Sequence, residues 1–129
     1  MFLMVLLTFI IGVVAMLTRL ESLRSGNLKM GYFKLMEGQN TPERVILTTR
    51  CFNNMFEVPV LFYAAGVLSI TLGVESLPAL TFAWLFVALR YLQALVHLTS
   101  NSLLIRMSSF WMSFICVLVL WTNMFVFQK

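Results

Sequence analysis

Polar and charged side chains interrupt an otherwise apolar stretch, RCFNNMFEVPVLFYAAG, at residues 50–66. Its first half carries Arg50, Asn53, Asn54 and Glu57, whereas its second half is apolar. At about 100° per residue of α-helix, Arg50, Asn54 and Glu57 fall within about a 60° arc and form one polar stripe. Such a stripe offers a guanidinium, an amide and a carboxylate, which can bind a polar ligand or pair with a neighbouring helix.

A second polar stripe lies further along the chain. Arg90, Gln93, His97 and Asn101 share one face of a predicted helix. Consecutive membrane-spanning helices run in opposite directions, so the two stripes are expected at matching depth, where they can meet. A charge near the bilayer centre costs roughly 2.5–3.5 kcal/mol on insertion scales, and the charged members of both stripes therefore need partners.

Two interpretations of the stripes remain open. In the first, Glu57 pairs with an arginine, above all Arg50, and the buried ion pair holds the helices together. In the second, the stripes line a pocket for a polar, anionic ligand reached from the cytoplasm. The second accounts better for the whole set, because two arginines, two asparagines, a glutamine and a histidine exceed what one carboxylate can satisfy. Taken alone, His97 is more typical of a packed helix residue than of a catalytic base, and Arg106 could equally be a loop charge that sets topology.

The elements that must position these stripes are predicted to be membrane-spanning helices. The chain has 129 residues, of which 60% are hydrophobic and only 11% are charged, with a mean hydropathy of +0.92. Soluble domains carry roughly 25% charged residues. At about 20 apolar residues per span, the composition predicts an all-α integral membrane protein with one domain of four helices. The expected helices cover about residues 1–20, 42–72, 77–101 and 107–127.

Helix starts are indicated by local signals. In the sequence NTPE, Thr41 is expected to be the N-cap of the second helix, with Pro42 at its first position and Glu43 near the positive end of the dipole. Pro78 is expected to open the third helix. The first apolar run lacks a basic segment before it and a small-residue cleavage site, so we interpret it as a retained span.

The distribution of charge between the loops predicts the orientation in the membrane. The first loop carries Arg19, Arg24, Lys29 and Lys34, whereas the second carries Glu75. Because positive loops stay in the cytoplasm, the first and third loops are expected there, with both termini on the other side and the site open to the cytoplasm. Only Lys129 argues against this orientation.

Other classes of site have little support. Cys51 and Cys116 lie in apolar stretches and make no metal-ligand spacing with His97, so no metal site is expected. The net charge of +4 comes without a basic run or interleaved aromatic residues, so no nucleic-acid partner is expected.

The motif RCFNNMFEVP has the form R-x-x-x-N-x-x-E with a following proline, and it resembles helix two of the MAPEG family (membrane-associated proteins in eicosanoid and glutathione metabolism). The segment FAWLFVALRYLQALVHLTSNSLLIRMSSF is similar to the third helix of that family and the start of its fourth. The resemblance covers essentially the whole chain. It implies a homotrimer of four-helix bundles in which glutathione, where it is used, binds between adjacent subunits near the cytoplasmic side.

The resemblance also implies roles for individual residues. The Glu57 match would receive the amino group of glutathione, and His97 stands where several members have a tyrosine that helps to hold the tripeptide. Arg106 lies where some members have an arginine proposed to activate the thiol, and it is the candidate catalytic residue. The candidate binding residues are Arg50, Asn54, Glu57, Arg90, Gln93 and His97.

Three functional hypotheses follow. The first is a glutathione-dependent transferase or peroxidase that acts on lipophilic electrophiles, with glutathione as thiol co-substrate and membrane lipids around it. The second is a non-catalytic member of the same fold that binds a lipid or a partner protein. The third is an unrelated small membrane protein such as a transporter subunit. A transporter would be expected to show paired inverted halves or broken helices, and the sequence indicates neither.

Overall fold

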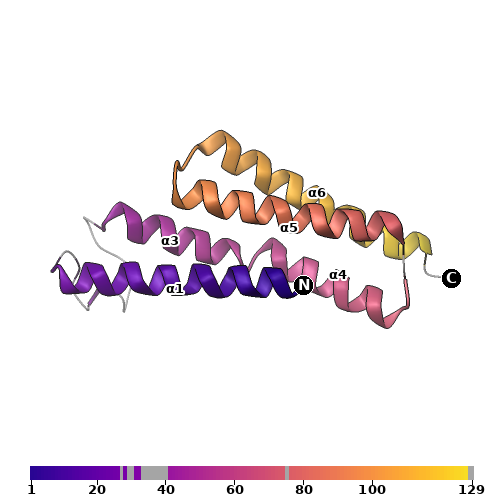
Figure 1. The fold of residues 1–129 in the computed structure, drawn as a ribbon, viewed down its shortest axis with the longest axis horizontal. Coiled ribbons are helices and arrows are strands. Elements are labelled where there is room, and N and C mark those ends of the chain that lie inside the picture. The colour runs from indigo at the N-terminus through magenta and orange to yellow at the C-terminus, as the bar shows by residue number, and fades with distance from the viewer. Residues whose placement is uncertain (27, 29–30, 33–40, 75, 128–129) are drawn as a thin grey trace.

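The structure, a computed structural model, describes residues 1–26, 28, 31–32, 41–74 and 76–127. Within these residues the secondary structure is helical, without strands, as the sequence predicts (Figure 1). The predictions that rest on Lys29, Lys34, Glu75 and Lys129 lie outside the described residues. The helices are α1 (Phe2–Arg24), α3 (Glu43–Asn54), α4 (Val58–Thr71), α5 (Leu77–Leu98) and α6 (Leu103–Phe127).

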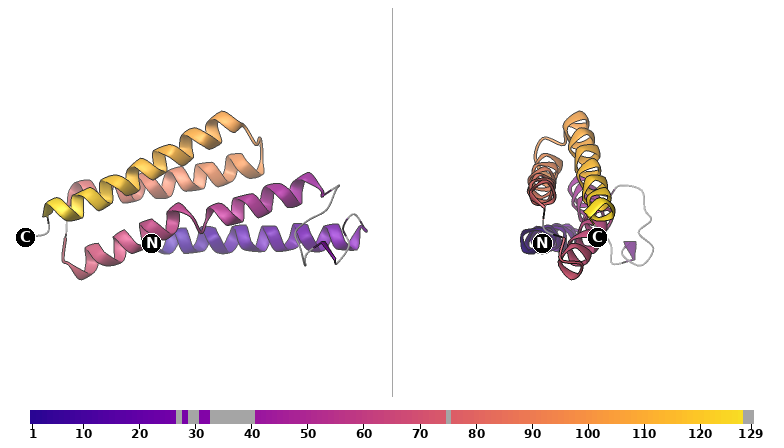
Figure 2. Two further views of the ribbon diagram at one scale, coloured as in Figure 1. Left: turned by 180° about the vertical axis from the view of Figure 1, so that it is seen from behind. Right: turned by 90° about the vertical axis from the view of Figure 1, so that its right-hand side faces the viewer.

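In the described part of the chain, four segments are long and apolar enough to cross a membrane, which confirms the predicted number of spans. They are Phe2–Arg24, Glu43–Thr71, Leu77–Leu98 and Leu103–Val126. The second of these consists of α3 and α4 together. The helices form an elongated bundle in which α1 packs along α3, α5 packs along α6, and α4 also contacts α6 (Figures 1 and 2).

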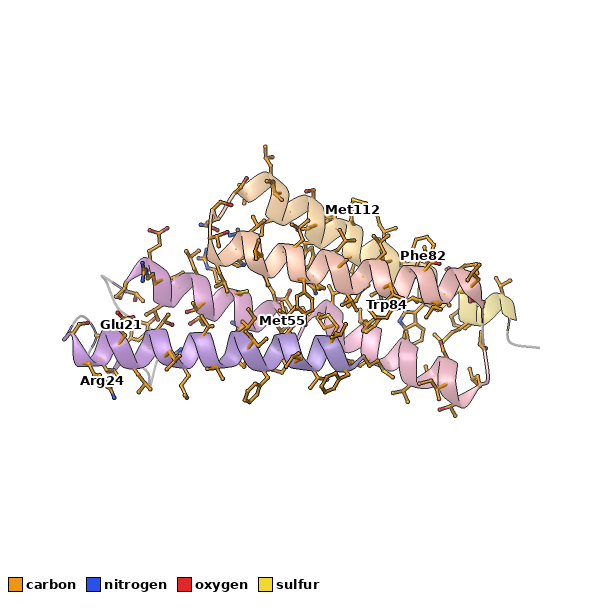
Figure 3. All side chains as sticks on the ribbon, in the orientation of Figure 1. Glu21, Arg24, Met55, Phe82, Trp84 and Met112 are labelled. Carbon is orange, nitrogen blue, oxygen red and sulfur yellow. The ribbon has the colours of Figure 1, made fainter. Side chains whose placement is uncertain are left out.

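Apolar side chains fill the bundle and also cover its outside. Met55 is only 2% exposed and lies between the helices, whereas Met112 is 51% exposed and points outward (Figure 3). Inside the bundle, the rings of Phe62 and Phe86 stack with centroids 4.4 Å apart. Exposed large apolar side chains lie on α1, α4, α5 and α6, as expected where the surrounding solvent is lipid.

The second span is not the continuous helix expected from the sequence, because it breaks at residues 55–57. The physical reason is Pro59. Its ring would clash with the carbonyl of Met55 in an unbroken helix, and it has no N–H to donate. The chain instead ends α3 at Asn54 and begins α4 at Val58, with Glu57 as the N-cap of α4.

The ends of several helices also differ from those expected. The N-cap of α3 is Pro42 and not Thr41, because Pro42 has extended backbone while its carbonyl accepts from the N–H groups of Val45 and Ile46. Ser76 caps α5 by accepting from the N–H of Ala79 at 3.2 Å. The turn between α5 and α6 is shorter than expected, since α5 ends at Leu98 and α6 begins at Leu103.

The contact between α1 and α3 is close and partly polar. A Cβ atom at Gly12 would lie 3.1 Å from the ring of Phe52, so glycine permits this approach. Near the polar end of the bundle, the hydroxyl oxygens of Thr18 and Thr48 lie 3.0 Å apart. At the next residue of each helix, Nη2 of Arg19 donates to the hydroxyl of Thr49 at 3.0 Å. These bonds fix how α3 is rotated about its axis, and hence which of its faces points toward α5.

Candidate functional site

A polar cavity of about 250 Å³ lies where α3, the helix break, α5 and α6 meet. It brings together five of the seven residues selected from the sequence, from four separate parts of the chain. The cavity is lined by Arg50, Asn53, Asn54, Glu57, His97 and Arg106.

The first part of the cavity wall comes from α3 and the break. Arg50 and Asn54 lie one helical turn apart on α3, as their spacing predicts. The helix then ends at Asn54, and Glu57 is the last residue of the break, with a non-helical backbone (φ −91°, ψ −99°). Glu57 therefore reaches the cavity from a turn and not from the continuous helical stripe that its spacing suggested.

Glu57 is not held in an ion pair. The side chains of Arg50 and Glu57 are both exposed. Among the described residues, no ion pair joins Glu57 to an arginine. The structural interpretation of the motif, an Arg50–Glu57 ion pair that holds helices together, is therefore not what this protomer contains. The carboxylate and the guanidinium are instead both free to contact a ligand.

Arg90 and Gln93 do not line the cavity but lie behind it, in the interior of the bundle. Arg90 is fully buried, and its Nη1 donates to Oε1 of Gln93 at 2.6 Å. Its Nη2 donates to the backbone carbonyl of Asn54 at 3.4 Å. The guanidinium lies between the rings of Phe86 and Phe110, with its carbon 5.6 and 5.4 Å from their centroids.

These contacts explain how a fully buried arginine is accommodated. Cation–π contacts and hydrogen bonds replace part of the hydration that burial removes. The carbonyl of Asn54 is one of the groups that the end of α3 leaves without an intrahelical partner. Arg90 thus fastens α5 to the broken end of α3, which is a supporting position with no access to the cavity.

His97 forms the inner part of the cavity wall. It is only 2% exposed, and neither of its ring nitrogens has a hydrogen-bond partner among the described residues. A buried polar group without a partner costs free energy comparable to a lost hydrogen bond. A neutral imidazole offers one donor and one acceptor, so His97 can offer both to a ligand in the cavity.

Arg106 lies in the first turn of α6, directly after the turn that joins α5 to α6. It is half-buried, and its Nη1 donates to Oδ1 of Asn101 at 2.6 Å. A guanidinium has five N–H donors, so most remain available after this bond. The short turn is what brings Arg106 of one helix beside His97 of the other.

Two residues of this region were not selected from the sequence. Asn53 lines the cavity, although it lies just outside the helical stripe of Arg50 and Asn54. Asn101 was placed on the second stripe, but its bond to Arg106 crosses a turn, and helical spacing does not describe such contacts. The signal that could have found Asn101 is its residue type, because asparagine is typical of left-handed turns.

Metal ions in proteins require a set of ligating side chains. Among the described residues, no group of three or more His, Cys, Asp and Glu side chains is placed to hold a metal ion. Cys51 and Cys116 are buried and free.

The fold and the cavity define a multi-pass α-helical membrane protein with a polar, arginine-lined site toward one end of its spans. The chain belongs to the MAPEG family, whose family model matches residues 1–126. The match spans nearly the whole chain of 129 residues and confirms the resemblance seen in the sequence. Comparisons with curated proteins and with solved structures gave no match.

Proposed function

We propose that this protein is a glutathione-dependent transferase or peroxidase that acts on lipophilic electrophiles from the membrane. The observation that carries the proposal is the content of the polar cavity, where Arg50 and Arg106 stand beside an unpaired carboxylate and an unpartnered imidazole. Membership of a family linked to glutathione and eicosanoid metabolism supports the same ligand.

The groups of glutathione match those of the cavity. The tripeptide carries two carboxylates, one ammonium group and a thiol. Arginine binds carboxylates through parallel N–H···O bonds, which suits Arg50, and Asn54 can donate to the same oxygens. Glu57 supplies the one negative charge needed for the ammonium group. His97 can accept from or donate to the peptide groups of the ligand.

In the proposed mechanism, Arg106 stabilises the reactive form of the thiol. A free thiol has a pKa of about 8.5, so only a few per cent is thiolate at neutral pH. A guanidinium beside the sulfur favours the anion, and the proton leaves to solvent. In transfer, the thiolate then forms a C–S bond to the electrophilic carbon as the leaving group departs with its electron pair. In peroxide reduction, the thiolate attacks a peroxide oxygen as the O–O bond breaks, and the alkoxide takes up a proton and leaves as the alcohol. A second glutathione then displaces water from the resulting sulfenic acid to form the disulfide.

The assembly and orientation follow from the same proposal. Arg50 and Glu57 are exposed on a single protomer and the cavity is open, which is consistent with a homotrimer in which a neighbouring subunit completes the site. The arginines at this end of the bundle, Arg19, Arg24, Arg44 and Arg106, favour the cytoplasmic side for it. Native mass spectrometry in mild detergents tests the trimer, and labelling of cysteines introduced near Lys29 and Glu75 tests the orientation.

A second candidate function is supported by a second cavity. An apolar cavity of about 610 Å³ lies between α4 and α5 and is lined by side chains such as Phe62, Ala65 and Leu80. It shares no lining residue with the polar cavity. A non-catalytic protein that binds a lipid chain would need this cavity and not Arg106.

The deciding experiment is calorimetry of the detergent-purified protein with glutathione, followed by transfer to 1-chloro-2,4-dinitrobenzene and reduction of a lipid hydroperoxide. S-methylglutathione is the control, because it keeps the tripeptide but cannot form a thiolate. Binding of both ligands with turnover of glutathione alone supports the enzyme. Absence of glutathione binding would reject it in favour of the lipid-binding function.

A further inference from the structure

Asn101 lies in the turn between α5 and α6 and has an unusual backbone. Its φ is +48°, and it is the one described residue other than glycine with a positive φ. Its N–H donates to the carbonyl of Val96 at 2.7 Å, which ties the turn to the last turn of α5. Asparagine tolerates the left-handed region better than most residues. The backbone of Asn101 is therefore fixed relative to α5.

The side chain of Asn101 forms a hydrogen bond with Arg106. Its Oδ1 accepts from Nη1 of Arg106 at 2.6 Å, which is short, as expected when the donor is charged. The backbone of Arg106 is itself held by the bond from its N–H to the carbonyl of Ser102 at 3.1 Å. The guanidinium is thus restrained at both ends of a long side chain, which otherwise has many rotamers.

Asn101 does not reach the polar cavity itself. It lines a neighbouring cavity of about 570 Å³, together with Thr99 and Ser100, and is absent from the wall formed by His97 and Arg106. It can therefore affect chemistry in the polar cavity only through Arg106.

We propose that Asn101 is a positioning residue that fixes the guanidinium of Arg106 at the cavity wall, where the thiol of glutathione would lie. The inference rests on the proposed function for its chemical consequence, although the restraint on Arg106 can be measured without it. A misplacement of about 1 Å in a reacting group can cost a hundredfold in rate. Loss of the amide should therefore lower reactivity and leave the affinity for glutathione nearly unchanged.

The test uses Asn101→Gly, because glycine keeps the left-handed backbone and removes only the side chain. Ser100→Gly is the matched control, since it adds a glycine to the same turn at a residue that does not line the polar cavity. We expect Asn101→Gly to lower kcat at least tenfold, with the Kd for glutathione within about twofold of wild type. The thiolate absorbance of bound glutathione near 240 nm should fall in parallel, and Ser100→Gly should change none of these.

A double-mutant comparison separates positioning from a general effect on the turn. If Asn101 acts through Arg106, then Asn101→Gly should have no further effect on kcat in an Arg106→Ala background. A merely structural role would lower activity in both backgrounds, and this result would overturn the proposal.

A third measurement is independent of activity. Phenylglyoxal modifies accessible arginines, and the rate at Arg106 can be followed by peptide mass spectrometry. We expect a several-fold faster rate in Asn101→Gly and an unchanged rate in Ser100→Gly. An equal rate in wild type and Asn101→Gly would show that the amide does not restrain Arg106. If the rate rises but the wild type transfers no thiol, the proposed function fails while the positioning of Arg106 stands.

Discussion

The polar region has two layers, the cavity wall and the layer behind it that Arg90 and Gln93 form. Both layers contain arginine, but the surroundings of the guanidinium differ. Arg106 and Arg50 reach the wall with donors to spare, whereas Arg90 is fully buried between two phenylalanine rings. Arg90 shares its sequence stripe with His97, which belongs to the wall. The difference teaches that an arginine within a membrane span is a candidate for chemistry only where the fold leaves its donors open to a ligand.

The largest effect that tests the difference between the two layers is expected at Arg90. Arg90→Ala should destabilise the protein by about 2–5 kcal/mol, because it empties the space between Phe86 and Phe110 and leaves the acceptors of Gln93 and Asn54 unpaired. Denaturant titration in a fixed detergent measures this effect. Arg50→Ala is the control, since its exposed side chain should change stability by no more than about 0.5 kcal/mol. Equal stability of the two variants would contradict the supporting role of Arg90.

At the cavity wall, Arg106→Ala should lower activity strongly and stability little, the opposite of Arg90→Ala. We expect a loss of about 10²–10³-fold in transfer to 1-chloro-2,4-dinitrobenzene, as for removal of one donor that stabilises a reacting anion. Glutathione binding and unfolding should stay close to wild type. Arg106→Lys should recover part of the activity, because a point cation still favours the thiolate but lacks the planar fork. An active Arg106→Ala would place thiol activation elsewhere, with His97 the next residue to test.

Glu57 gives a smaller effect that distinguishes a ligand contact from an ion pair. Glu57→Gln keeps the shape of the side chain and removes its charge. If the carboxylate binds the ammonium group of glutathione, affinity should fall by about 1.5–3 kcal/mol in calorimetry. The thermal midpoint without ligand should change little, because no salt bridge joins Glu57 to an arginine among the described residues and its attraction to Arg90 acts without direct contact. A lower midpoint with unchanged affinity is the result that an ion pair would give.

The smallest effect is expected at the uncharged pair Thr18 and Thr48, where α1 contacts α3. Thr48→Val removes the hydrogen bond to Thr18 and keeps the volume of the side chain. Hydrogen bonds between membrane helices average about 0.6 kcal/mol in double-mutant cycles, so the loss of stability should be of that order. The cycle with Thr18→Val isolates the pair, and a coupling above about 2 kcal/mol would show that this contact matters more than its chemistry suggests.

The residues of the cavity were predictable to different degrees. Arg50 and Asn54 followed from helical spacing, because both lie on one uninterrupted helix. Glu57 reaches the same cavity from a broken segment, where periodicity no longer applies. Arg90 and Gln93 share a stripe with His97, but spacing cannot say which members of a stripe face a neighbouring helix and which face a cavity. The bond between Asn101 and Arg106 depends on a turn whose conformation the sequence did not reveal.

The sequence by itself determined the class of the molecule. Its low content of charge and its four long apolar segments require helices, because within a bilayer every backbone polar group must find a partner inside the chain. Its motifs identified the family. Only the tertiary structure decided that the second span breaks before Pro59, that Arg90 supports the break from inside, and that Arg106 is held by Asn101. These features depend on which atoms of distant segments meet, and contacts between helices are fixed by packing and burial, which the order of residues along one helix does not specify.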